Sequence, residues 1–508
     1  MDGHASASGL GATGREQILG LHPLTFALLL QVIVWSVGPA LFFGNLHADT
    51  LEAAYWGRDW ALGYAKHPPV TTWLIDLTLR TGLQPIFALM LFSQLTVMVT
   101  AFFVWRIARL FASRDTAALA VLLYVVSPAA TVYAAQLNHN SVLAPFWVAT
   151  AYVGLLYLEE RRWGHAVLLG LVAGLGMLTK YEILFVLVSL LVIGAVTPRY
   201  RGAFTHPASY LAAFIFLLVI APHVWWLDVN RWPSLSRALG AEKIENMRAL
   251  NVSGVNLILG LFTLFITPCL ILLATIRERR ADEITDGPGH RMIPALLGFA
   301  PLAVLMLGAM ATMQVVKPLW VLPLSSTVAI ALAVLFPAGG PEEGLRVKRT
   351  AQIICGASLF VFAGFVAYLT VAGVIGKPLT AYAADTKKLA EATDALWAQN
   401  RQTPLACVII TDRKIGPSGV LWLKSRPDFV DFSSGGWQTP AQIARCRRTG
   451  GIAVISEGLE VLDQFPAACR ASVRRIDLPT APGMGKVRFP LDLVYVPPEG
   501  DAAGCPSS

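Results

Sequence analysis

The chain has 508 residues, of which 55% are apolar and only 14% are charged. Soluble proteins have about 25% charged residues, so this composition excludes an ordinary soluble enzyme and predicts a polytopic membrane protein. The formal net charge of +8 does not indicate a nucleic-acid partner, because the basic residues lie in short loops beside apolar segments instead of one stripe interleaved with aromatics.

Apolar runs that suit membrane helices recur along most of the chain. A helix needs about 20 mostly apolar residues to cross the hydrocarbon core. We therefore expect a mainly α protein with about eleven spans. They lie near residues 23–43, 85–106, 115–134, 141–158, 165–179, 182–197, 205–227, 254–276, 292–312, 317–337 and 351–375. Residues 1–22 carry no convincing cleavage site, so the first span is expected to stay as an anchor.

The short loops between these runs predict the orientation. Lys and Arg are enriched in cytoplasmic loops, and the basic clusters from Arg106 to Arg349 fall on one side when eleven spans are counted. The tail at 1–22 is then cytoplasmic. The membrane domain at 23–375 has its first periplasmic loop at 44–84.

Residues 376–508 are expected to form a small periplasmic α/β domain. Strand-like runs at 407–411, 420–423, 452–455 and 493–496 accompany a helix-like stretch at 385–399. Four cysteines in this region are compatible with two disulfides in an exported domain, or with free thiols. They are Cys407, Cys446, Cys469 and Cys505, and their three possible connectivities stay open.

Residues 45–69 place two carboxylates, several aromatics and a Lys-His-Pro-Pro corner directly after the first apolar run. If residues 49–60 are helical, Asp49, Glu52 and Trp56 share one face, because their spacing is i, i+3 and i+7. Ionisable groups at a membrane surface are costly, which favours a catalytic site. An interfacial amphipathic helix with solvated acids explains the spacing equally well.

Further polar groups lie near the predicted external ends of spans. Pro68 and Pro69 end any helix, so Lys66 and His67 form a corner where a lysine can bind phosphate or extend to headgroups. Lys180 is followed by Tyr181 and Glu182, and it is either a functional group or the partner of Glu182 in a structural ion pair.

Two motifs together resemble the first-loop signature of bacterial family 39 glycosyltransferases. They are Asp49-x-x-Glu52-Ala53-x-Tyr55-Trp56 and Leu62-Gly63-Tyr64-x-x-His67-Pro68-Pro69. The stretches 174–181 and 222–234 resemble later parts of that family, which is related to protein O-mannosyltransferases and to the aminoarabinose transferase that modifies lipid A. The resemblance covers roughly residues 23–375. It implies a C-type glycosyltransferase fold, with the acid-bearing loop beneath a periplasmic domain, and a polyprenyl-phosphate sugar donor.

By position, the resemblance makes Asp49 the expected base. The chain departs from many relatives in two places: Leu51-Glu52 stands where they have Asp-Glu, and Lys66 stands where they have an acid before His-Pro-Pro. The first departure weakens a mechanism that uses two carboxylates. The second implies a changed donor or acceptor, or a different arrangement of acid and base.

With this resemblance, the sequence predicts an inverting glycosyltransferase of the bacterial inner membrane. It moves a hexose or pentose from polyprenyl phosphate to lipid A, core saccharide or another glycolipid at the periplasmic face. Asp49 and Glu52 are the predicted catalytic residues. The predicted phosphate- or substrate-binding residues are Tyr55, Arg58, Tyr64, Lys66, His67, Lys180, Tyr181, Trp225, Arg237, Lys243 and Lys317. A divalent cation, Mg²⁺ or Mn²⁺, suits carboxylate ligands, but Asp49 and Glu52 alone make an incomplete site.

Three alternatives stay open at this point. A transporter or lipid flippase also uses many helices and buried charges, although no duplicated halves are visible in the sequence. A protein O-glycosyltransferase fits the same resemblance with a different acceptor. A catalytically inactive relative fits the missing acids. The sequence does not determine the sugar, for which a hexose, a pentose and a uronic acid are all open. It also does not determine the acceptor or the oligomeric state.

Overall fold

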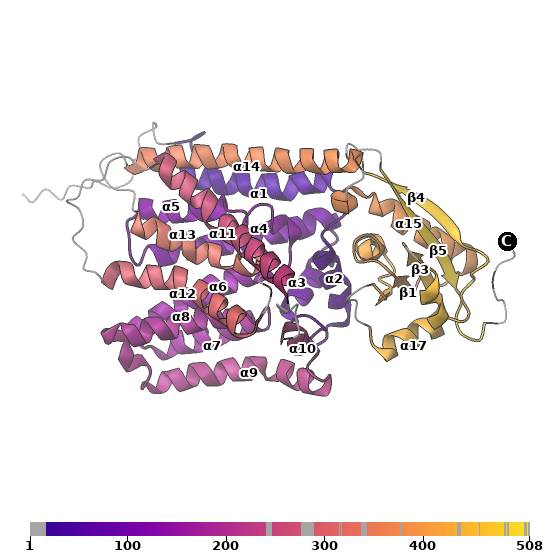
Figure 1. Cartoon of the computed structure of the whole chain (residues 1–508), viewed down its shortest axis with the longest axis horizontal. Helices are drawn as coiled ribbons and strands as arrows, with labels where there is room; N and C mark the ends of the chain where they lie inside the picture. Colours follow the sequence, from indigo (N-terminus) through magenta and orange to yellow (C-terminus); the bar gives the residue numbers. More distant parts are fainter. Residues whose placement is uncertain are drawn as a thin grey trace, which may run out of the picture.

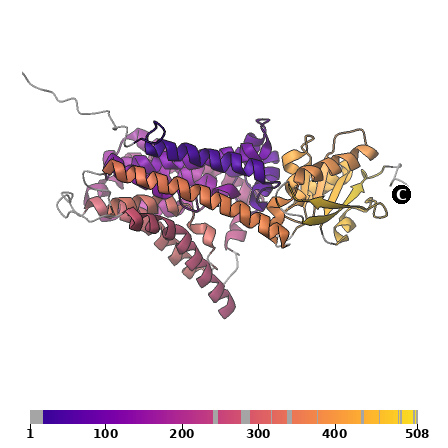
Figure 2. The same ribbon diagram turned by 90° about the horizontal axis from the view of Figure 1, so that it is seen from above.

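The structure is a computed structural model in which a helical bundle forms one end and a small sheet the other (Figure 1). Seen from above, the same two parts lie end to end (Figure 2). The residues that the structure describes are 17–239, 246–275, 289–313, 315, 317–336, 343–375, 378–433, 438–456, 458–481, 484, 487–501 and 505.

Each apolar run predicted as a span contains a helix. These are α1 (Pro23–Phe42), α4 (Pro85–Ala108), α5 (Arg114–Val125), α6 (His139–Glu160), α7 (Trp163–Met177), α8 (Ile183–Val196), α9 (Pro207–Val229), α11 (Met247–Thr275), α12 (Gly289–Ala311), α13 (Leu324–Leu335) and α14 (Glu343–Val374). Within the described residues, α1, α4, α6, α9, α12 and α14 are long and apolar enough to cross a membrane.

Two of the predicted spans are shorter helices than expected. The runs at 115–134 and 317–337 contain α5 and α13, which have 12 residues each. Pro128 follows the end of α5, and Pro323 directly precedes α13. Proline lacks a backbone N–H and restricts the residue before it, so these prolines limit the helices where hydropathy alone continues.

Small residues let two of the helices approach closely. An added Cβ on Gly170 of α7 would lie 2.5 Å from the Ala212 carbonyl of α9, and one on Gly174 would lie 2.8 Å from Val219. The Gly-x-x-x-Gly pattern therefore lets α7 pack closely against α9 at Gly170 and Gly174.

The C-terminal region holds a five-stranded sheet with the order β2-β1-β3-β5-β4. Its strands are β1 (Cys407–Ile410), β2 (Asp428–Asp431), β3 (Gly451–Ile455), β4 (Arg474–Pro479) and β5 (Arg488–Val496). β1 is parallel to β2 and β3, while β5 is antiparallel to β3 and β4. The helices α15 (Thr386–Asn400), α16 (Gly419–Trp422) and α17 (Pro440–Thr449) complete this region.

The strand predicted at 420–423 is wrong, because these residues belong mainly to the short helix α16. A run of four apolar residues carries no period that separates a buried strand from a buried helical turn. β2, which follows at Asp428–Asp431, takes the place beside β1 in the sheet.

The first loop lies between the bundle and the sheet. It contains α2 (Ala48–Trp56), the turn η1 (Gly57–Asp59) and α3 (Val70–Leu79), and α2 faces the sheet region (Figure 1). One continuous apolar core includes Trp35 of α1, Leu51 of α2 and Val408 of β1. The Gly44 N–H donates to the Tyr382 carbonyl at 2.9 Å, so backbone hydrogen bonds also join the two parts.

Candidate active site

α2 starts at a cap that its own sequence provides. The Asp49 N–H donates to His47 Nδ1 at 3.2 Å, which satisfies one of the free donors of the first helical turn. The helix predicted over 49–60 ends at Trp56 and continues as η1. Both carboxylates therefore project from a regular helix, but the Asp49 side chain is 43% exposed while that of Glu52 is 7% exposed.

Glu52 is held by two cations. Its Oε2 accepts from Lys66 Nζ at 2.6 Å and from Arg413 Nη2 at 2.5 Å. Burial raises the pKa of the Glu52 carboxyl, and the charges of Lys66 and Arg413 act against that increase. Asp49, Glu52, Lys66 and Arg413 are called the acid cluster below.

Arg413 is the member of the acid cluster that the sequence did not suggest. It follows β1 in a loop from the C-terminal region, and its Nη2 lies 3.5 Å from Asp49 Oδ1. The one available signal was its position two residues after a predicted strand, since functional groups of open α/β sheets gather at the carboxyl ends of parallel strands.

The Lys-His-Pro-Pro corner contacts the acid cluster through Lys66. Lys66 Nζ lies 5.5 Å from the centroid of the Trp56 ring, which stacks on Tyr64 with centroids 5.7 Å apart. Burial raises the pKa of Tyr64 to about 12, so its phenol stays protonated at neutral pH. The ring of His67 stacks on that of His139 at 3.8 Å, which places the first turn of α6 beside the corner.

Tyr55 and Arg58 contact the C-terminal region instead of an open cleft. The Tyr55 hydroxyl donates to Asp431 Oδ2 at 2.7 Å. Arg58 Nη2 donates to the Val420 carbonyl at 3.0 Å, and the guanidinium lies over the Phe429 ring at 5.3 Å. Burial lowers the pKa of Arg58 to about 10. Both side chains join the first loop to the sheet, so their predicted contact with substrate stays a prediction.

Lys180 forms the ion pair that the sequence offered as an alternative. Its Nζ lies 2.5 Å from Glu182 Oε1 and donates to Asn140 Oδ1 at 2.8 Å. The next residue, Tyr181, hydrogen-bonds through its hydroxyl to His223 Nε2 at 2.9 Å. His223 Nδ1 in turn lies 2.8 Å from the Leu62 carbonyl. These contacts fix the end of α9 against the first loop.

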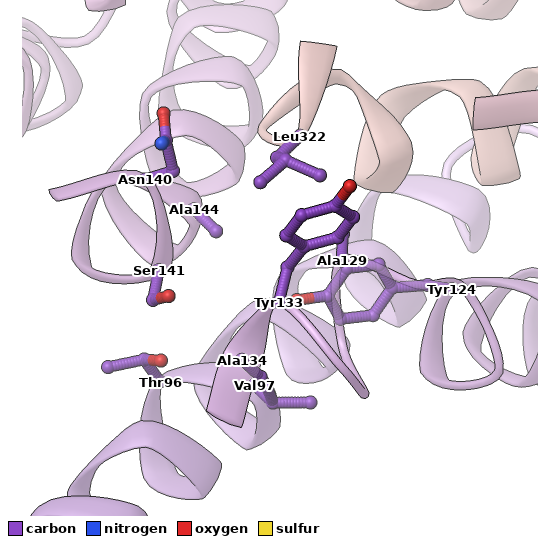
Figure 3. Close-up of a pocket in the computed structure, with 10 residues that line it drawn as sticks. All are labelled: Thr96, Val97, Tyr124, Ala129, Tyr133, Ala134, Asn140, Ser141, Ala144 and Leu322. Atoms are coloured by element: carbon purple, nitrogen blue, oxygen red, sulfur yellow. The ribbon is translucent and has the colours of Figure 1, made fainter. Parts of the chain in front are cut away.

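A pocket lies beside Asn140 at the start of α6 (Figure 3). Its lining is mostly small or aromatic and consists of Thr96, Val97, Tyr124, Ala129, Tyr133, Ala134, Asn140, Ser141, Ala144 and Leu322. Asn140 links this pocket to Lys180 through the hydrogen bond described above.

The remaining predicted residues are not part of the contacts described for the acid cluster. Trp225 on α9 is 63% exposed, and Lys317 is exposed before the turn η5 (Pro318–Val321). Arg237 belongs to α10 (Pro233–Leu239), but its side chain lies outside the described residues, as does all of Lys243.

The donor set does not fit a divalent cation. Both close contacts of Glu52 Oε2 are with side-chain cations, so the position that a metal would take is filled by Lys66 and Arg413. In the part of the chain that the structure describes, no group of three or more His, Cys, Asp or Glu residues is arranged to hold a metal ion.

Comparison with known proteins gives a consistent set of relatives. The family model described as dolichyl-phosphate-mannose-protein mannosyltransferase matches residues 66–226. Lipid A galacturonosyltransferase RgtD of Rhizobium johnstonii is 27% identical over 206 residues, which are 39% of this chain and 42% of that protein. Lipopolysaccharide core galacturonosyltransferase RgtA of the same organism is 23% identical over 412 residues, or 77% of this chain and 79% of that protein.

The fold matches a solved membrane protein over nearly the whole chain. ArnT from Cupriavidus metallidurans, bound to undecaprenyl phosphate, has a TM-score of 0.59 and 12% sequence identity, and the match covers 95% of this chain and 99% of ArnT. The apo structure of ArnT gives a TM-score of 0.60. The chain is therefore similar in sequence to membrane glycosyltransferases over part of its length, and it shares the fold of ArnT over nearly all of it.

Proposed function

We propose that this protein transfers a sugar, with inversion, from a polyprenyl-phosphate donor to lipid A or core saccharide at the periplasmic face of the bacterial inner membrane. The observation that carries the proposal is Asp49, a half-exposed carboxylate that pairs with Arg413 at the junction of bundle and sheet. The relatives RgtD and RgtA are named galacturonosyltransferases of lipid A and of the core. Galacturonic acid is therefore the first sugar to test.

The chain direction supports the external placement of Asp49. α1 leads into α2, α6 starts beside the Lys-His-Pro-Pro corner, and α9 ends against the first loop. The arginine-rich connections after α4, α6 and α8 therefore lie at the other end of the bundle. Because basic loops stay cytoplasmic, we place residues 1–22 inside, and the first loop and the region 376–508 in the periplasm.

The proposed reaction is one direct displacement. The Asp49 carboxylate takes the proton of an acceptor hydroxyl, whose oxygen forms a bond to the anomeric carbon as the bond from that carbon to the phosphate oxygen breaks. The leaving group is the polyprenyl phosphate, and attack from the opposite side inverts the anomeric centre. Lys66 and Arg413 are the cations of the acid cluster, and in this proposal they stabilise the charge that develops on the leaving phosphate.

Asp49→Asn tests this assignment. General-base assistance contributes roughly 10²–10⁴-fold in rate, so we expect kcat to fall by about that factor while the protein stays folded. The measurement is transfer of labelled galacturonic acid from polyprenyl phosphate to lipid A in proteoliposomes. Asp59→Asn is the matched control, since Asp59 lies in the same loop but contacts Gln442. Wild-type activity in Asp49→Asn removes Asp49 from the mechanism.

Two further measurements separate this function from its competitors. Movement of labelled polyprenyl phosphate between leaflets, without sugar transfer, identifies a flippase. Mass spectrometry of lipid A, core and periplasmic proteins from a deletion strain identifies the acceptor. Loss of one uronic-acid residue from lipid A or core is the expected result, whereas a sugar lost only from proteins overturns the glycolipid acceptor.

A further inference from the structure

The acid cluster contains one residue supplied by the C-terminal region. Arg413 lies more than 360 positions from Glu52 in the chain, yet its Nη2 is 2.5 Å from Glu52 Oε2. The same nitrogen is 3.5 Å from Asp49 Oδ1. A single guanidinium nitrogen therefore bridges both carboxylates of α2.

The loop that carries Arg413 is fixed at several points. Oδ1 of the preceding residue, Asp412, accepts from the backbone N–H groups of Lys414 and Ile415 at 2.8 and 2.7 Å. The Lys414 carbonyl accepts from Asn45 Nδ2, in the segment that leads into α2, at 2.7 Å. The arginine thus approaches α2 from a backbone that is hydrogen-bonded both within its own turn and to the first loop.

The two carboxylates differ in what Arg413 does for them. Glu52 is buried and also paired with Lys66, so Arg413 completes an anchored ion pair there. Asp49 is far more open, and its contact with Arg413 is 1 Å longer, as the two distances of 3.5 and 2.5 Å show. The longer contact leaves the Asp49 carboxylate accessible to a hydroxyl group.

We propose that Arg413 is a positioning residue of the glycosyl transfer, which orients Asp49 through the shared ion pair with Glu52 and makes the C-terminal region part of the active site. This inference rests on the proposed function. The region 376–508 is then required for chemistry as well as for stability.

Other charged or titratable groups also surround Asp49. His47 Nδ1 lies 3.6 Å from Asp49 Oδ2, and burial lowers the pKa of this imidazole, so the ring is neutral at neutral pH. Glu52 and Lys66 are in the acid cluster, while His139 and Tyr382 also interact electrostatically with Asp49. Arg413 contacts Asp49 directly, with Nη2 at 3.5 Å from Oδ1.

The test compares two arginines that both cross from the C-terminal region to a carboxylate of the first loop. Arg413→Gln and Arg413→Lys change the contact with Asp49 and Glu52, while Arg426→Gln removes the ion pair with Asp76 of α3. Sugar transfer is measured in proteoliposomes over a range of substrate concentrations, at a temperature where thermal unfolding shows every variant folded.

We expect Arg413→Gln to lower kcat by about 10²-fold with little change in KM, because small displacements of a catalytic group have effects of that size. Arg413→Lys, which keeps a cation at this position, recovers part of the rate. Arg426→Gln keeps kcat within about threefold of wild type, since Asp76 is not in the acid cluster.

Two results overturn the inference while the proposed function stands. One is a wild-type kcat in Arg413→Gln. The other is an equal loss of kcat in Arg426→Gln, which makes Arg413 one of several residues that only join the C-terminal region to the first loop. A loss in Arg413→Gln that is confined to a higher KM also contradicts it. Failure of the proposed function looks different, because wild-type protein then transfers no sugar, and the inference falls with it.

Discussion

At the residue scale, the two acids of α2 share a helix but differ in environment. Glu52 is buried against Lys66 and Arg413, whereas Asp49 stands at the first turn with an open face. A buried carboxylate with two cations suits an anchor, and an exposed carboxylate suits proton transfer. The sequence predicted both as catalytic because helical spacing shows a shared face but not its burial.

Asp76 illustrates an acid with a structural role. Trp60 Nε1 and Arg80 Nε donate to its Oδ2 at 2.9 and 2.7 Å, and Arg426 pairs with its Oδ1. Burial acts to raise the pKa of Asp76, but these hydrogen bonds outweigh burial and lower the pKa below its ordinary value. The ionised form is therefore favoured in the folded protein.

This direction predicts how stability depends on pH. A carboxyl group whose pKa is lower in the folded state contributes stability above its unfolded pKa of 3.8 and loses it as pH falls through the folded value. We expect Asp76→Asn to lower the thermal midpoint at pH 7 and to flatten the loss of stability on acidification below about pH 4. Thermal unfolding of wild type and variant across that range is the measurement, and parallel curves contradict the assignment.

At the element scale, turn and packing residues set the helix limits that hydropathy missed. Prolines limit α5 and α13, and a short apolar run that looks like a strand forms α16. Helix existence followed from local composition. The positions of the helix ends and the choice between strand and turn depended on contacts with other segments, which form only in the folded protein.

The α7–α9 pair provides a test at this scale. We expect Gly170→Ala to destabilise the protein by about 1–3 kcal/mol, because the new methyl meets the Ala212 carbonyl at 2.5 Å. Gly164→Ala in the same helix is the control, since an added Cβ there has no described atom within 4 Å. Equal thermal midpoints of the two variants in detergent rule out close packing at Gly170.

At the scale of the whole molecule, bundle and sheet form one unit. Their shared core joins α1, α2 and β1, while Tyr55, Arg58 and Arg413 reach across the junction. The sheet region is itself closed by the disulfides Cys407–Cys446 and Cys469–Cys505. Cys407 begins β1, the strand that ends before the Arg413 loop.

Removing one disulfide therefore should affect both stability and activity. Loss of a native disulfide costs about 2–5 kcal/mol in small exported domains. We expect the double variant Cys407→Ser, Cys446→Ser to unfold at lower temperature and to lose sugar transfer as the Arg413 loop loosens. Cys269→Ser is the control, because that thiol is free. Full activity of the double variant, measured at a temperature where it is folded, shows that the Arg413 loop is held in place without the disulfide.

The sequence by itself determined the membrane helices, the polar first loop and the acid motif, because these depend on composition and on spacing of a few residues along one helix. The tertiary structure alone decided the disulfide pairing, the strand order and the presence of Arg413 beside Glu52, 361 positions away. Local periodicity records which face of an element is apolar, but contacts between distant segments arise only when the whole chain packs.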